Sequence, residues 1–418
     1  MKIRKFILCA AAAACALAGV AQNGTMTPYS RFGLGILSDN ASAAQNSMGG
    51  VGYGMNSGRQ INVMNPASYA RVDSLTFLFD MGADLTMLWS KETVTDASGA
   101  EKRLSDRQTG GGLGYITMQF PVSKRLGVSV GVLPFSSVGY AFGNDIDNGY
   151  ASRQGAGSIN QLYVGLGAKI YKGLNLGVNV AYLFGTTYND TYAVTETGSQ
   201  GLFEKQLEVR DFRINIGAQY TLPLGKDALT LGLVYTPGKK LLGNTKTIYY
   251  DLTAESDTPP AETDKFKLKD RYKLPDTYGI GLNYLMDRRL MVEADFTYQP
   301  WKDCLFDGKK GVLADRWKVS LGTQYQHAVR GGYLKRIQYR AGVFFDRDYL
   351  VVRDNNVREY GASVGFGLPV PGFKTVVSLG FGWMHRQAYP SALIKEDYFN
   401  ITLGINFNEM WFRKSKIY

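Results

Sequence analysis

The feature that most constrains this chain is a two-residue alternation of apolar and polar side chains that recurs over long stretches. In residues 212–222 one set of alternate positions reads Phe, Ile, Ile, Ala, Tyr and Leu, and the other reads Arg, Asn, Gly, Gln and Thr. Residues 290–298, 317–325, 337–345 and 399–407 show the same pattern. A period of two is that of a β-strand with one apolar face, so the chain is predicted to be all-β.

Two architectures place an apolar face on every strand: a soluble sandwich and a transmembrane barrel. Strands of soluble proteins average about 5–6 residues, and the alternating stretches here are longer. Their apolar faces also begin and end with Tyr, Trp and Phe, as strands do at membrane interfaces. The 49 Gly and the 13% of aromatic residues suit tightly packed strands better than helices. We therefore expect a transmembrane antiparallel β-barrel rather than a sandwich.

The N-terminus has the pattern of a secretory signal. Lys2, Arg4 and Lys5 precede an apolar run over residues 6–18, and small residues follow up to Ala21. Residues 1–21 are therefore predicted to be a signal peptide, so the protein is exported. A lipoprotein anchor at Cys15 is the weaker alternative, because only alanines precede it.

The residue stock excludes several classes of function. The mature chain keeps one cysteine, Cys304, and the whole sequence has two histidines, His327 and His385. This stock cannot build a histidine- or cysteine-rich metal site, and the two histidines fall near opposite strand ends. We expect no metal, no cofactor and no enzymatic activity. The formal charge of +11 does not indicate nucleic acid in an exported barrel.

The spacing of turns gives the strand count. Six very short turns alternate with seven longer, more polar links, which connect 14 strands over residues 75–418. Bacterial barrels keep short turns in the periplasm and long loops outside, so both chain ends are expected in the periplasm of a Gram-negative bacterium. The longest link, residues 237–273, is predicted to be an extracellular hairpin. Residues 22–74 are rich in Gly and Ser but too apolar for a solvated tail, and are predicted to plug the lumen.

Several motifs in this chain resemble those of a known family. Pro28-Tyr29-Ser30-Arg31-Phe32-Gly33-Leu34-Gly35, Gly49-Gly50-Val51-Gly52, Asn65-Pro66-Ala67-Ser68 and Leu274-Pro275-Asp276 are similar to segments of the long-chain fatty acid transporter family of outer-membrane barrels. The resemblance implies a 14-stranded barrel with an N-terminal plug that passes hydrophobic compounds across the outer membrane. Some relatives instead serve as partner barrels, such as the shuttle protein of type IX secretion.

Two functions follow from this resemblance. The first is an outer-membrane channel for uptake of small hydrophobic molecules such as long-chain fatty acids. The alternative is a structural or partner barrel associated with an outer-membrane secretion or assembly machine. The expected partners are outer-membrane lipid and glycolipid, a hydrophobic ligand, and a protein of such a complex.

Three sets of uncharged residues are candidates for these roles. Asn65, Pro66 and Ala67 are expected to anchor the plug, because Pro66 stiffens the chain just before the first strand. Pro134 and Phe135 interrupt the third strand, since proline gives no N–H to a ladder. They indicate either a tolerated bulge near the rim or, by resemblance, a kink through which apolar molecules leave sideways. Four plug methionines would line that route: Met26, Met48, Met55 and Met64.

A fourth set of candidates is charged, and two further groups of residues are predicted to have structural roles. Lys265, Lys267, Lys269 and Arg271 alternate along an extended piece and indicate either a solvated face or contact with glycolipid phosphates. Inward-facing Arg213, Glu293, Asp295, Lys318 and Arg340 are expected to pair with one another and with the plug. Residues 110–114, Gly-Gly-Gly-Leu-Gly, look like a phosphate loop but do not lie between a strand and a helix. They are predicted to be turn or lumen glycines.

Overall fold

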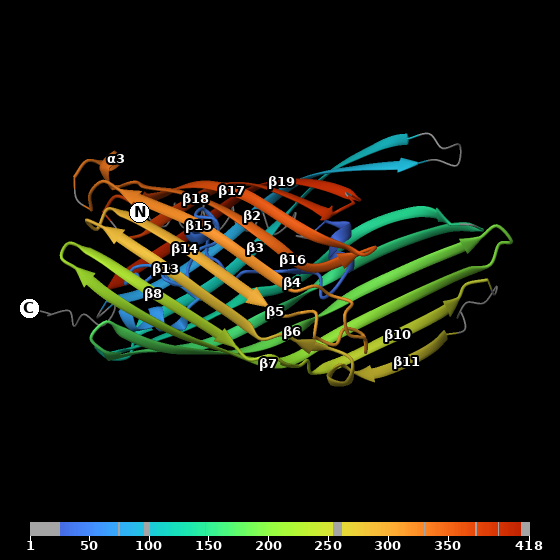
Figure 1. The fold of residues 1–418 in the computed structure, drawn as a ribbon, viewed down its shortest axis with the longest axis horizontal. Coiled ribbons are helices and arrows are strands. Elements are labelled where there is room, and N and C mark those ends of the chain that lie inside the picture. Colours follow the sequence, from blue (N-terminus) through green and yellow to red (C-terminus); the bar gives the residue numbers. More distant parts are fainter. Residues whose placement is uncertain are drawn as a thin grey trace, which may run out of the picture.

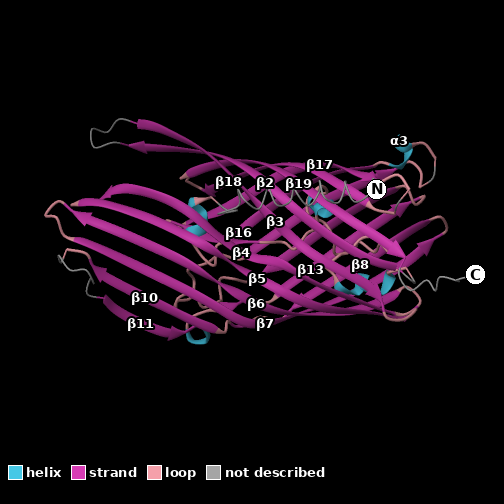
Figure 2. Cartoon of the chain, turned by 180° about the vertical axis from the view of Figure 1, so that it is seen from behind, coloured by secondary structure: helices cyan, strands magenta, loops and turns pink. Residues whose placement is uncertain are grey.

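The computed structural model describes residues 26–73, 76–95, 101–146, 148–253, 261–329, 331–372, 374–391 and 393–410. The predicted signal peptide, residues 1–21, lies outside these ranges. Nearly all regular structure is β-strand (Figure 2). Fourteen strands pair antiparallel in chain order, and β19 returns to pair with β2, which closes the barrel and confirms the predicted fold class. The strands of the ring are β2 (Thr76–Thr95), β3 (Glu101–Pro121), β4 (Leu126–Ile146), β5 (Gly149–Tyr171), β6 (Leu174–Thr195), β7 (Gln200–Leu224), β8 (Asp227–Thr236), β13 (Thr277–Met286), β14 (Leu290–Gln299), β15 (Arg316–Gln326), β16 (Gln338–Val352), β17 (Asn355–Pro369), β18 (Val376–Tyr389) and β19 (Ile394–Met410).

The polarity of the two faces of the wall is the reverse of that in a soluble protein: apolar side chains point outward and charged ones inward. Ile214 and Leu282 on the outer face are 46% and 48% exposed, whereas Glu293 on the inner face is fully buried. A soluble sandwich would bury its apolar face, so this distribution excludes that alternative. The apolar belt is the surface that a barrel presents to lipid.

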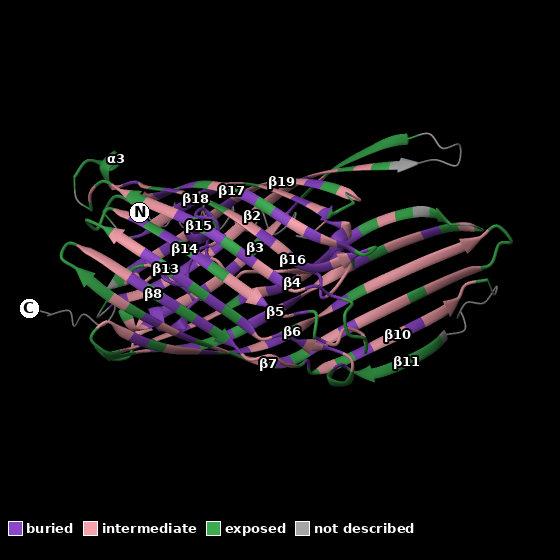
Figure 3. Ribbon diagram, viewed as in Figure 1, coloured by how far each residue is buried: buried purple, intermediate pink, exposed green. Residues whose placement is uncertain are grey.

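Strands β2 to β7 are longer than the sequence predicted. They contain 20 to 25 residues, although about ten suffice to cross a bilayer. Three of the seven longer links that the sequence predicts fall at residues 91–109, 143–156 and 191–205, and these three predictions are wrong, because most of the described residues there continue the strands. Outside the membrane both faces of a strand meet water, so the apolar alternation that reveals a strand is lost. Figure 1 shows these ends projecting beyond the rest of the barrel, and Figure 3 shows that they are mostly exposed or half-buried.

The link between β8 and β13 adds to the wall outside the ring. It contains β9 (Lys239–Lys240), β10 (Gly243–Asp251), β11 (Ala261–Lys267), the 3₁₀ turn η3 (Leu268–Asp270) and β12 (Lys273–Leu274). Strand β10 pairs with the outer half of β7 and with β11, so β10 and β11 form a hairpin.

The N-terminal segment, residues 26–73, occupies the lumen and is called the plug below. Its short elements are η1 (Pro28–Arg31), β1 (Ile36–Leu37), α2 (Ala43–Asn46) and η2 (Pro66–Arg71). No helix in the described part of the chain is long and apolar enough to cross a bilayer. Wall glycines make room for the plug: a Cβ on Gly177 would meet the backbone of Pro66, and one on Gly342 would meet the backbone of Met48.

Candidate functional site

Two carboxylates on β14 hold the middle of the plug. Glu293 and Asp295 are two residues apart, so both side chains point into the lumen. Asp295 Oδ2 accepts hydrogen bonds from the N–H groups of Gly52 (2.7 Å) and Tyr53 (2.9 Å). Glu293 Oε1 accepts from Gly54 (2.7 Å) and Met55 (3.0 Å). Four consecutive backbone donors of a segment without secondary structure are thereby satisfied inside the barrel.

The structure places the three predicted anchor residues at the inner wall. Asn65 is fully buried and caps η2, because its side chain accepts a hydrogen bond from the Ala67 N–H (3.1 Å). The Asn65 amide also donates to the Tyr53 carbonyl (2.8 Å). Pro66 lies against Gly177 of β6. The amide of Asn65 therefore joins η2 to the segment that the β14 carboxylates hold.

A group of charged residues makes a further link between plug and wall. Asp39 of the plug forms ion pairs with Lys318 and with Arg316 (2.9 Å), both on β15. Arg316 also pairs with Asp346 of β16 (2.6 Å). The expected pairing of Lys318, Glu293 and Asp295 with the plug is thus observed. Arg340 instead bonds wall residues, including Ser378 (2.9 Å).

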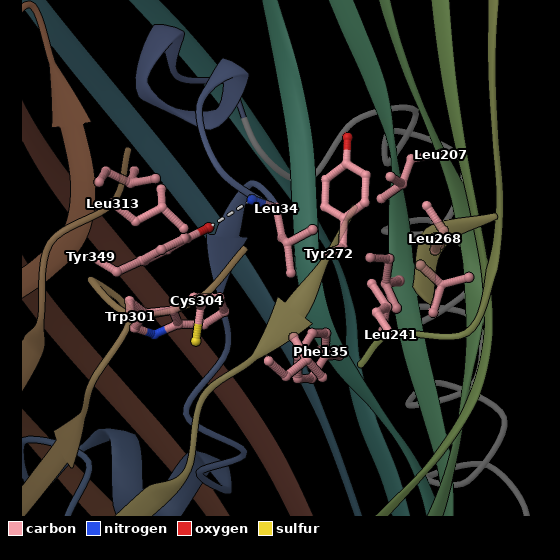
Figure 4. Close-up of a cluster of buried hydrophobic side chains, with 14 of the residues drawn as sticks. Leu34, Phe135, Leu207, Leu241, Leu268, Tyr272, Trp301, Cys304, Leu313 and Tyr349 are labelled. Atoms are coloured by element: carbon pink, nitrogen blue, oxygen red, sulfur yellow. Dashed lines mark hydrogen bonds between the residues drawn. The ribbon is translucent and has the colours of Figure 1, made fainter. Parts of the chain in front are cut away.

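A hydrophobic cluster at the outer end of the lumen joins the plug to the loops between the strands. Residues 239–242, 268–274 and 301–314, called the lid below, fold over the plug (Figure 4). The Leu34 N–H of the plug donates to the Tyr349 hydroxyl of β16 (2.9 Å), which itself donates to the Gly35 carbonyl (2.5 Å). The Trp301 ring of the lid lies 4.5 Å from that of Tyr349. Plug, lid and wall therefore share one core.

The lid is also fastened by charge. Asp307 pairs with Lys205 of β7 (2.7 Å) and with Arg271 (3.2 Å). Burial would raise the pKa of Asp307, but the two cations outweigh it and lower that pKa below its ordinary value. Burial raises the pKa of the Cys304 thiol to about 11, so this cysteine acts as a packed apolar side chain.

The wall has a seam between β3 and β4. Their ladder runs from Pro121 opposite Gly127 to Ile116 opposite Val132 and stops there. Beyond it β3 continues to pair with β2, and β4 with β5. In Figure 1 the outer ends of β2 and β3 stand away from the neighbouring strands.

Pro134 and Phe135 lie where the seam opens. The register between β4 and β5 shifts between Pro134 and Ser136, so Phe135 is bulged. Its side chain joins the buried cluster under the lid, and the Arg213 guanidinium lies 5.4 Å from its ring. The bulge that the sequence offered as one alternative is present, but it lies well inside β4 rather than close to the rim. The β4 side of the seam is covered by β1 of the plug, with Ile36 opposite Ser137 and Leu37 opposite Ser136.

A cavity of about 670 Å³ lies behind the seam, inside the barrel. Both sides of the seam contribute to its wall, through Gly111 and Gly112 of β3 and Pro134 and Ser136 of β4. The rest of the lining mixes charged residues, among them Asp39, Arg316, Lys318, Asp346 and Arg386, with apolar residues, among them Ile36, Leu37, Phe344 and Phe381.

The four plug methionines do not lie along one path, which corrects the expected apolar route. Met48 and Met55 pack together with Val51 and Met291. Met64 packs against Tyr53 and Val234, and Met26 borders a cavity of about 200 Å³ that shares lining residues such as Ile36 and Asn400 with the large one. None of the four lines the large cavity behind the seam. Their flexible side chains fill gaps between plug and wall.

The four expected glycolipid contacts are split between two surroundings, which corrects the expected alternation. Lys265 and Lys267 are exposed on β11, but η3 interrupts the strand before Lys269. Arg271 turns toward Asp307 and stacks 3.7 Å from the centre of the Phe266 ring. Sequence reasoning missed three residues that fasten the plug and the lid, because no periodic pattern surrounds them: Asp39, Tyr349 and Trp301.

The overall architecture is shared with solved outer-membrane channels. The CymD monoaromatic hydrocarbon channel is 12% identical, with a TM-score of 0.59 over 89% of this chain and 98% of that chain. A Pseudomonas aeruginosa FadL homologue is 12% identical, with a TM-score of 0.59 over 90% of this chain and 99% of that chain. The P. putida toluene transporter TodX is 13% identical, with a TM-score of 0.60 over 90% of this chain and 99% of that chain. At such identities the similarity concerns the fold alone. The chain is therefore a closed 14-strand antiparallel β-barrel of the FadL-like fold.

The family is more specific than the fold. No curated protein matches the chain. The BamG family model matches residues 2–418, and the chain therefore belongs to the BamG family. The expected resemblance is thus correct for the fold, while the family is BamG.

Proposed function

We propose that this protein is a structural partner barrel of the β-barrel assembly machine in the outer membrane of a Gram-negative bacterium. The family name associates its members with that machine. This is the alternative that the sequence left open beside hydrophobic uptake. In this role the barrel contributes surfaces to a complex and passes no substrate through its lumen.

The observation that carries the proposal is the firm attachment of the plug inside the lumen. The plug is attached at η2, at Gly52–Met55 and at Leu34–Gly35, and these attachments are buried. Displacing it would leave backbone N–H groups and carboxylates without partners, and each buried unsatisfied group costs about 1–3 kcal/mol. A barrel built in this way is suited to act as a rigid body.

The ion-paired part of the cavity wall is unfavourable for a hydrophobic cargo. Arg316, Asp346 and Asp39 form an ion-paired group on its wall. An apolar molecule placed there would remove water from these charges without replacing its hydrogen bonds, which is unfavourable.

A second candidate function is uptake of small hydrophobic molecules through the seam. The open ladder between β3 and β4 and the cavity behind it favour this function. On that hypothesis the ligand would leave sideways past Pro134 into the bilayer.

Affinity purification from native outer membranes in mild detergent distinguishes the two functions. The tagged protein should retain a stoichiometric set of assembly-machine subunits, whereas an unrelated tagged barrel at equal abundance should not. Depletion of the protein should also lower the amounts of several other outer-membrane barrels. Co-purified fatty acid or hydrocarbon without any stoichiometric protein would instead favour uptake and overturn our proposal.

A further inference from the structure

The seam leaves one long strand edge without a ladder partner. Residues 101–115 of β3 pair with β2 on one side, and the described residues contain no strand paired on the other side. In a strand that is flanked on both sides, alternate residues direct their N–H and C=O groups to each neighbour. Outside a bulge at Gly114, every second residue of this segment therefore presents to the seam main-chain groups that have no ladder partner among the described residues.

The outer and inner parts of this edge differ in chemistry. Residues 101–108 read Glu-Lys-Arg-Leu-Ser-Asp-Arg-Gln, and charged side chains on an exposed edge discourage unspecific pairing. Residues 110–114 read Gly-Gly-Gly-Leu-Gly and carry no such protection. Trp89 on β2 pairs with Arg107, which places the aromatic end of the lipid-facing surface just outside the glycines. The bare edge thus lies at membrane depth.

Lipid cannot satisfy the main-chain groups of a bare edge. An extended chain segment could, through a ladder with residues 110–115. The seam already binds one such segment, because β1 of the plug pairs with the opposite edge at Ser136 and Ser137. The cavity behind residues 110–114 provides room for the inward side chains of an additional strand.

We propose that the edge of β3 at residues 110–115 is a docking site for a β-strand of a partner protein. Six residues give about 20 Å of ladder along the strand, which spans roughly half of the bilayer core at a strand tilt of about 45°. Gly110 and Gly112 face inward with their partners Thr86 and Asp84, whereas Leu113 faces outward and is 55% exposed. The docked strand should accordingly alternate small or polar residues toward the cavity with apolar residues toward lipid. The identity of the partner as a member of the assembly machine rests on the proposed function.

Photo-crosslinking in intact cells tests this site. A benzophenone amino acid is placed at Leu113 or at Thr109, which lies four residues away on the same outward face. Val364 is the matched control, because it is 52% exposed on the outer face but paired on both sides, with Ala341 and Phe381. We expect protein adducts at Leu113 and Thr109 but not at Val364. The two partner positions should lie about four residues apart, which is the signature of a ladder.

Proline variants connect the adduct to the ladder. Adjacent residues direct their N–H groups to opposite neighbours, so one of Gly110→Pro and Gly111→Pro removes a donor from the seam. That variant should still fold, as judged by the change in electrophoretic mobility that a folded barrel shows on heating. Its adduct yield should fall roughly fivefold. Unchanged yield in both folded variants, adducts only with a second copy or with lipid, or partner positions without the four-residue spacing would each overturn the proposal.

The outcome can be separated from that of the proposed function. Assembly-machine subunits that co-purify while Leu113 gives no adduct would overturn the docking site and leave the proposed function intact. An adduct with the expected spacing to a protein outside that machine would support the docking site and overturn the proposed function.

Discussion

At the scale of single residues, Asp295 is one of the two carboxylates of β14 that hold the plug. We predict that Asp295→Ala weakens plug binding by about 2 kcal/mol, because the buried N–H groups of Gly52 and Tyr53 lose their acceptor. Transient release should raise trypsin cleavage after the exposed Arg59 about 30-fold. The matched control is Asp227→Ala, whose carboxylate bonds Tyr284 and Asp287 away from the plug. Equal cleavage rates for both variants would contradict the role of Asp295.

Asp307 gives a pH dependence at the same scale. Its folded-state pKa is lowered by Lys205 and Arg271 despite burial, so its contribution to lid closure is fully present above the unfolded pKa of about 3.9. That contribution is lost as the pH falls through the lower folded value. We predict that fluorescence of the buried Trp301 shifts toward a solvent-exposed signal below about pH 4. Asp307→Asn should abolish this pH step, and a step that persists in the variant would contradict the assignment.

At the scale of elements, the sequence predicts strands well where the wall contacts lipid. Residues 212–222 and 290–298 alternate because one face meets lipid and the other the plug, and they lie within β7 and β14. The outer half of β3 carries no such signal, since charged residues occupy both faces. The lid residues Trp301 and Leu313 are apolar without any period, so their burial depends on contacts that only the folded chain defines.

The glycines of the wall are a second element-scale feature, and they yield a matched pair of variants. A Cβ on Gly342 would meet the Met48 backbone, whereas a Cβ on Gly382 would be 3.8 Å from the nearest heavy atom, Asn400 Cβ. We predict that Gly342→Ala destabilises the plugged barrel by about 1–3 kcal/mol, since backbone cannot move aside easily. Gly382→Ala should be neutral within about 0.5 kcal/mol. Denaturant unfolding monitored by barrel mobility measures both, and equal midpoints would show that the plug does not press on this wall.

At the scale of the whole molecule, plug, lid and barrel share one hydrophobic cluster. The cluster under the lid includes Leu34 of the plug, Trp301 of the lid, and Leu183, Leu207 and Tyr349 of the wall. The sequence predicted a plug and a barrel but not the lid that joins them. The seam is the one place in the ring where adjacent strands separate over a long stretch of the described residues.

The closed lumen leads to a prediction about conductance. In planar bilayers the intact protein should give no stable ion channel, because the plug and the lid obstruct the lumen. Deletion of residues 26–58 removes the segment that Asp295 and Glu293 hold and exposes a polar inner wall, so a stable conductance should appear. Heat-modifiable mobility checks that the shortened protein still forms a barrel. If the intact protein conducts ions, the lumen is open, which would support the uptake hypothesis. If the shortened barrel folds but shows no conductance, the lid alone closes the pore. The plug would then serve mainly to cover the β4 side of the seam.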